Sequence, residues 1–136
     1  MRRPALEDPR EGDSGGGGAG AGLSAGDLFA VLWEALADIL GTAATATLLR
    51  RAAQRAAPRW PELAALSITR ESLDYRYSVP SAWREPALDP PQALCELARE
   101  LSALLVDLTG AVVVNRLAQV PELRDRGIVA PAGVEP

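Results

Sequence analysis

Histidine and lysine are absent from this chain of 136 residues, and cysteine occurs once, as Cys95. Histidine is the side chain that most enzymes use as a general base and a common metal ligand, and lysine supplies the amine of Schiff-base catalysis. A single cysteine excludes an intramolecular disulfide. Most familiar catalytic and metal-binding chemistries are therefore excluded or made difficult. We expect no enzyme activity, no cofactor and no metal site, and we expect Cys95 to serve as a small buried hydrophobe.

Aromatic residues are also scarce, at 4% of the chain, whereas hydrophobic residues as a whole make up 48%. Alanine and leucine supply most of the hydrophobic content, which predicts a helical core of modest size. The formal charge is −4, and every basic residue is an arginine. The abundance of Ala, Arg, Gly and Pro is typical of a GC-rich bacterial genome, so we expect a bacterial source.

Both ends of the chain are poor in large apolar side chains. Residues 1–23 combine proline, charges of both signs and a glycine run at 15–18, so they cannot bury enough apolar surface to offset the entropy of ordering. The glycine run follows no strand and lacks the Lys-Ser/Thr pair of a phosphate loop. We therefore expect a disordered tail over 1–23, one folded domain over 24–128 and a flexible tail over 129–136.

Two features argue against export and membrane insertion. No apolar stretch follows Arg2 and Arg3, so these residues do not begin a secretory signal. Glu34 and Asp38 interrupt the first long apolar segment, which argues against a membrane span. We expect a cytoplasmic location and no membrane partner.

The start of the predicted domain is typical of two successive helices. Apolar residues over 28–40 recur at spacings of three and four, which is the pattern of one helix face. Ser24 is placed to cap the first amides of this helix, and Asp27 lies at its positive end. Gly41 is a stop signal, and a second helix is expected over 43–57.

Between residues 66 and 79 the apolar pattern changes from helical to alternating, which predicts a β-hairpin. Arg70-Glu71-Ser72 is its expected connection. Because two strands alone are marginally stable, the apolar face of this hairpin must pack on the helices or on another chain. The predicted face consists of Leu66, Ile68, Leu73, Tyr75, Tyr77 and Val79.

Asp89-Pro90-Pro91-Gln92 is the clearest helix start, with Asp89 as the cap, Pro90 at the first helical position and Gln92 at the capping-box position. Leucines follow in three-four alternation and form a stripe that resembles a coiled-coil seam more than a broad core face. A small domain with such a stripe often completes its core with a second copy or a partner, so we expect a homo-oligomer or a protein complex. The predicted contact residues are Leu94, Leu97, Leu101, Leu104 and Leu108.

Residues 111–120 fit either a strand, through three successive valines, or a helix, through Val113, Leu117 and Val120. We favour a helix because Asn-Arg-Leu-Ala-Gln is poor strand material. The predicted fold is thus a small, mostly helical α+β domain. Its elements are two N-terminal helices, a β-hairpin, a long leucine-striped helix and a shorter C-terminal helix.

The leading functional hypothesis is a non-catalytic interaction module, such as an adaptor, a chaperone-like protein or a regulatory subunit. It acts through helix-mediated self-association or through binding of a protein partner. A second hypothesis is a sensory or carrier domain that holds a small apolar ligand among aromatic side chains, although a core packed with the same rings is the simpler interpretation. The candidate pocket residues are Trp33, Tyr75, Tyr77 and Trp83.

A third hypothesis is DNA binding through residues 36–55, which resemble a helix-turn-helix. It requires Thr45, Arg50 and Arg51 on one exposed face, and the net negative charge opposes it. Paired carboxylates also occur, at Glu34/Asp38 and at Glu96/Glu100. Both pairs are interpreted as solvated helix faces, because solvated faces carry such pairs routinely and neither pair is flanked by other candidate polar groups.

Overall fold

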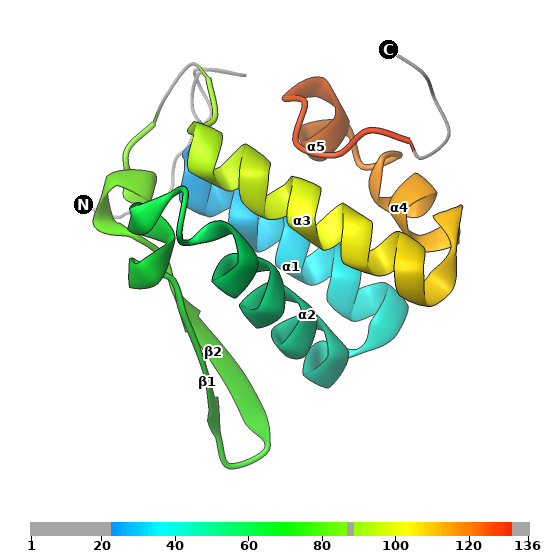
Figure 1. Ribbon diagram of the computed structural model, residues 1–136, viewed down its shortest axis with the longest axis horizontal. Coiled ribbons are helices and arrows are strands. Elements are labelled where there is room, and N and C mark those ends of the chain that lie inside the picture. Colours follow the sequence, from blue (N-terminus) through cyan, green and yellow to red (C-terminus); the bar gives the residue numbers. More distant parts are fainter. Residues whose placement is uncertain (1–22, 87–88, 132–136) are drawn as a thin grey trace, which may run out of the picture.

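The computed structural model describes residues 23–86 and 89–131 (Figure 1). Within these residues the chain forms five α-helices, two short 3-10 helices and one two-stranded antiparallel hairpin. This is the predicted α+β architecture. The expected tails fall largely on residues 1–22 and 132–136, which lie outside the described residues. Val129 is buried in the core, so the fold extends past the expected boundary at residue 128.

The first two helices are present as the sequence predicts, with the second shifted by one residue from the expected 43–57. Helix α1 (Ala25–Leu40) starts with a reciprocal capping box: the Asp27 amide donates to Ser24 Oγ at 3.0 Å, and the Ser24 amide donates to the Asp27 carboxylate at 2.9 Å. These bonds satisfy two amides that the first helical turn leaves without partners. Helix α2 (Thr42–Ala56) follows Gly41, whose φ of 89° is accessible to glycine without strain.

The long helix α3 (Gln92–Thr109) packs beside α2, and α1 lies against α2 (Figure 1). The prediction that Asp89 caps α3 is wrong, because the cap position is Pro91 and no side chain among the described residues bonds to this helix start. A residue that precedes proline is disfavoured in helical conformation, so Pro90 cannot be the first helical residue before Pro91. The Pro91 backbone is itself extended, and the helix begins only after it.

Two short helices complete the core. Helix α4 (Ala111–Leu117) follows Gly110, whose φ is 72°. It confirms the helical interpretation for residues 111–117, whereas residues 118–120 form a turn. Helix α5 (Pro121–Asp125) contacts α1, and α4 contacts α3 and α1. The helices α1, α2, α3 and α4 thus share one continuous core.

The leucine stripe of α3 is used inside the chain's own core rather than at its surface. Leu94, Leu97, Leu101 and Leu104 are buried. Their expected role as a contact surface for a partner is therefore corrected, since α2 and α4 pack against α3 and these leucines belong to the chain's own core. Of the five predicted contact leucines, only Leu108 is exposed.

The hairpin consists of β1 (Ser67–Glu71) and β2 (Asp74–Ser78), joined by Ser72 and Leu73. The predicted connection at residues 70–72 is therefore displaced, because Glu71 pairs with Asp74 and still belongs to a strand. Arginine and glutamate do not interrupt strand pairing, so the alternating pattern gave no sign of the true turn. Two 3-10 helices, η3 (Pro61–Ala65) and η4 (Ser81–Arg84), flank the hairpin.

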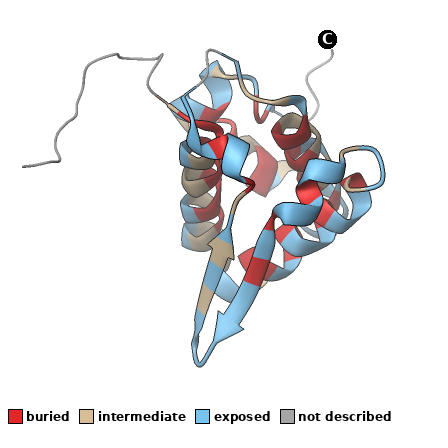
Figure 2. Ribbon diagram, turned by 90° about the vertical axis from the view of Figure 1, so that its left-hand side faces the viewer, coloured by how far each residue is buried: buried red, intermediate tan, exposed pale blue. Residues whose placement is uncertain are grey.

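The hairpin projects from the helical body, and only its base is covered (Figures 1 and 2). Ile68 is buried, and Tyr77, directly opposite on β2, is half-buried. The two turn residues, Ser72 and Leu73, are exposed. Within residues 23–86 and 89–131, none of the helices combines the length and apolarity that a bilayer crossing requires.

Candidate interaction surfaces

Four large hydrophobic side chains are exposed in the part of the chain that the structure describes. They occur in two places: the tip of the hairpin and the region where α3 ends and α4 begins. Isolated exposed hydrophobics are normal on protein surfaces, whereas a group of them beside a hollow marks a candidate interface. The exposed fractions are 84% for Leu73, 67% for Leu108, 66% for Val112 and 41% for Val106.

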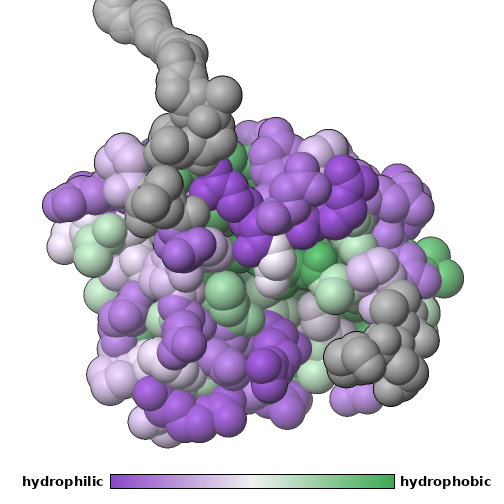
Figure 3. Space-filling model, turned by 90° about the horizontal axis from the view of Figure 1, so that it is seen from above, coloured by the Kyte–Doolittle hydropathy of each residue, from purple (hydrophilic) through white to green (hydrophobic). Residues whose placement is uncertain are grey.

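An open hollow of about 350 Å³ lies where the first turns of α2 meet the last turn of α3. We call it the Leu108 hollow, because Leu108 forms its α3 side. Small and apolar residues dominate the α2 side. In the view from above, a small area of hydrophobic surface is visible at the right-hand edge of the molecule, next to hydrophilic residues (Figure 3). The α2 residues that line the hollow are Ala43, Ala44, Thr47 and Leu48.

The opposite ends of α2 and α3 are joined by ion pairs. Arg55 Nε lies 3.1 Å from Glu100, and Arg59 lies 3.0 Å from Glu100 and 3.8 Å from Glu96. Both carboxylates are mostly buried beneath these arginines. The interpretation of Glu96 and Glu100 as a solvated face is thus corrected, since the neighbouring helix supplies partners that the local sequence does not show.

Three of the four predicted pocket residues meet at the base of the hairpin. The Tyr77 ring lies 4.8 Å from the Phe29 ring, edge to face, and 4.9 Å from the Trp33 ring. The Trp83 ring is 6.3 Å from Phe29, and its indole N–H donates to Glu62 at 2.6 Å. Partial burial, followed by the nearby Glu34 carboxylate, raises the pKa of Tyr77.

Tyr75 lies apart from this group, further along the hairpin, with the Arg70 guanidinium 6.0 Å from its ring centre. The ligand pocket therefore stays a prediction. The packing of the other three rings on one another and on Phe29 favours their assignment to the core.

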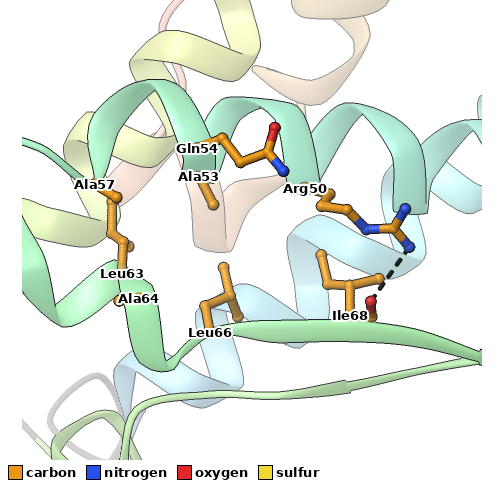
Figure 4. Close-up of a pocket in the computed structure, with 8 residues that line it drawn as sticks. All are labelled: Arg50, Ala53, Gln54, Ala57, Leu63, Ala64, Leu66 and Ile68. Carbon is orange, nitrogen blue, oxygen red and sulfur yellow. Dashed lines mark hydrogen bonds between the residues drawn. The ribbon is translucent and has the colours of Figure 1, made fainter.

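A groove of about 200 Å³ separates α2 from β1 (Figure 4). Leu63, Leu66 and Ile68 form one wall, and α2 forms the other. Arg50 on α2 donates a hydrogen bond of 3.2 Å to the Ile68 carbonyl across it. This bond and the aromatic contacts of Tyr77 hold both strands of the hairpin base against the helices.

The requirement of the DNA-binding hypothesis is not met. Thr45 is fully buried, and its hydroxyl donates to the Gly41 carbonyl at 2.8 Å. It therefore cannot share an exposed face with Arg50 and Arg51. A helical threonine often satisfies its hydroxyl in this way by bonding to the carbonyl four residues earlier.

Cys95 lies beside a third hollow, of about 270 Å³, between α3 and residues 127–130. The side chain is half-buried rather than fully buried as expected. Burial, with a smaller contribution from Glu96, raises the pKa of the thiol, and Arg99 opposes this shift. Among the described residues, no group of three or more His, Cys, Asp or Glu side chains is placed to hold a metal ion.

Sequence reasoning identified Leu108 as a contact residue, but it missed the other residues of the Leu108 hollow and the exposed hairpin tip. It placed Leu73 on a packed strand face, and it gave no role to Ala43 and Ala44. The only available signal was that Leu108 ends the leucine stripe beside Gly110, where a helix usually stops.

Comparisons of this chain with protein-family models, with curated proteins and with solved structures gave no match. The function must consequently be inferred from the exposed surfaces of the molecule.

Proposed function

We propose that the chain is a non-catalytic, cytoplasmic interaction module that associates with a second copy through the surface around the Leu108 hollow. One observation carries this proposal: Leu108 and Val112 are 67% and 66% exposed, four residues apart, on either side of the α3–α4 turn. Complete burial of an aliphatic side chain of this size is worth about 1.5–3 kcal/mol relative to exposure. Covering these side chains with apolar surface from another chain is therefore favourable.

The shape of the surface also supports association. The α3 stripe runs one turn beyond the chain's own core, because Leu104 is buried whereas Leu108 is not. Beside Leu108, Ala43 and Ala44 leave space on α2. Small residues at such a position allow another chain to approach closely, as the fully desolvated centre of an interface requires.

Self-association is tested by sedimentation equilibrium of the full chain over a wide concentration range. We expect the average mass to rise with concentration. The variant Leu108→Ser/Val112→Ser should weaken this association by at least about tenfold, because truncating central interface residues costs more than about 1 kcal/mol each. Far-UV circular dichroism checks that the variant remains folded.

Val106→Ser is the matched control. Val106 is also exposed on α3, but two residues from Leu108 along a helix is a rotation of about 200°, so it lies on another side. The control should associate like the natural chain. A chain that stays monomeric throughout, or an equal effect of the control, would contradict the proposed function.

A further inference from the structure

The hairpin tip carries a leucine where turn chemistry favours another residue. The turn between β1 and β2 has two residues, and its first, Ser72, has a φ of 59°. Two-residue hairpin turns are dominated by glycine, asparagine and aspartate, because these residues tolerate the required backbone and remain solvated. Leu73 satisfies no such preference and is 84% exposed. Departures of this kind from local rules are expected at functional positions.

The fold presents this leucine at the end of a held arm. At the base, the Tyr77 ring packs on Phe29 and Trp33, and Arg50 bonds to the Ile68 carbonyl. Beyond these contacts the hairpin leaves the helical body, and its tip is exposed (Figure 2). Because the base is fixed and Leu73 is exposed, the tip does not occupy a hollow of its own chain.

We propose that Leu73 of one copy inserts into the Leu108 hollow of a second copy. The inference rests on the proposed function and names the element that fills its surface. The hollow is open, has a volume of about 350 Å³ and is lined mainly by alanine and leucine side chains, so an aliphatic side chain is a suitable occupant. Each chain carries both the protruding leucine and the receiving hollow, so two copies related by a two-fold axis can make this contact twice.

Charge supports the same pairing. Asp74 follows Leu73 at the tip, and Arg51 lies one helical turn beyond Thr47 on α2. Among the side-chain hydrogen bonds and ion pairs between residues that the structure describes, none involves the Asp74 carboxylate or the Arg51 guanidinium. Asp107 precedes Leu108 on α3 and is exposed, so charge repulsion favours docking with Asp74 towards α2. There Asp74 and Arg51 complete an ion pair between the copies.

The other two hollows fit the tip less well. The groove between α2 and β1 lies at the base of the same hairpin, and the bond from Arg50 to the Ile68 carbonyl crosses it. The hollow beside Cys95 is lined by Arg99 and Ser102 as well as by apolar side chains. Each of these two hollows nevertheless supplies a control position for the cross-linking experiment that follows.

Site-directed disulfide cross-linking tests the contact directly. In a Cys95→Ala background, a Leu73→Cys chain is mixed with a Thr47→Cys chain and oxidised gently. We expect a mixed disulfide dimer that forms at least about tenfold faster than in mixtures with Gln54→Cys or Arg99→Cys, which report on the other two hollows. Each of the three receiving positions, Thr47, Gln54 and Arg99, lines a hollow. The comparison is therefore between cysteines that are similarly accessible to the tip of a second copy. Equal rates, or preferred cross-linking at Gln54 or Arg99, would overturn the proposal.

A charge exchange gives a second, independent readout. Asp74→Arg and Arg51→Asp should each weaken self-association several-fold, and the double variant should recover most of the loss. Leu73→Ser should weaken association as strongly as Leu108→Ser. If Leu108→Ser/Val112→Ser abolishes association whereas Leu73→Ser leaves it unchanged, the tip contact is refuted and the proposed function stands. If the natural chain is monomeric, both are refuted.

Discussion

Leu101 and Leu108 occupy equivalent places in one leucine stripe, seven residues apart on α3, yet they have opposite surroundings. Leu101 is completely buried among the other helices, and Leu108 is 67% exposed beside an open hollow. The difference arises because, beside Leu108, the short side chains of Ala43 and Ala44 on the first turn of α2 leave an open hollow instead of covering it. A periodic stripe thus identifies the apolar face of a helix, whereas its neighbours decide how much of that face is core.

The largest expected effect on stability is the difference between alanine substitutions at these two leucines. Leu101→Ala should lower the free energy of unfolding by about 2–5 kcal/mol, because it leaves a cavity in a closely packed core. Leu108→Ala should change it by less than about 0.5 kcal/mol, as is usual for exposed positions. Urea denaturation of dilute protein measures both. Similar losses for the two variants would mean that Leu108 also belongs to the core.

A smaller effect is expected where α2 and α3 are joined by charges. Glu100→Gln weakens the ion pairs with Arg55 and Arg59 and should cost about 0.2–1 kcal/mol, with a smaller loss at high salt. Asp107→Asn is the matched control at the uncovered end of the same helix, and we expect no measurable loss. If both substitutions had the same effect, the contrast between the two ends of the helix pair would not extend to charge.

The smallest effect on stability concerns Cys95, which lies between these extremes of exposure. Partial burial raises the pKa of its thiol above the ordinary value of 9.0, so the folded state favours the protonated form. Its contribution to stability is therefore present below the pKa of the unfolded thiol and is lost as pH rises through the higher folded value. The free energy of unfolding should fall less steeply in the alkaline range for Cys95→Ala than for the natural chain.

The same shift predicts slow alkylation of Cys95 near neutral pH, because the thiolate is the reactive form. A cysteine at the exposed position, Leu108→Cys in the Cys95→Ala background, should react faster under the same conditions. Iodoacetamide labelling followed by mass spectrometry compares the two rates. Equal rates would contradict both the partial burial of Cys95 and the exposure at residue 108.

Local signals predicted the parts of this fold that local physics decides. The spacing of Ser24 and Asp27 identified the start of α1, and the poor strand propensity of residues 115–119 identified α4. The start of α3 was misplaced because two successive prolines allow several starting positions from composition alone. The hairpin turn was misplaced because Arg70 and Glu71 suit a strand as well as a loop.

The candidate surface was largely hidden from sequence reasoning because it depends on which elements are neighbours. Leu108 lines the same hollow as Ala44 and Thr47 only because the start of α2 lies beside the end of α3. The pairing of Glu100 with Arg55 and Arg59 depends on the same arrangement. No spacing within a single helix encodes these contacts.

The central claim is that the Leu108 hollow and the hairpin tip are the surfaces through which copies of this chain meet. The most direct measurement is a dilution series of the isotope-labelled chain followed by amide NMR. We expect concentration-dependent shifts at residues 43–48, 72–74 and 108–112, and constant positions for residues 94–101. Spectra that do not change with concentration, or shifts confined to the surroundings of Cys95 or to the α2–β1 groove, would contradict the claim.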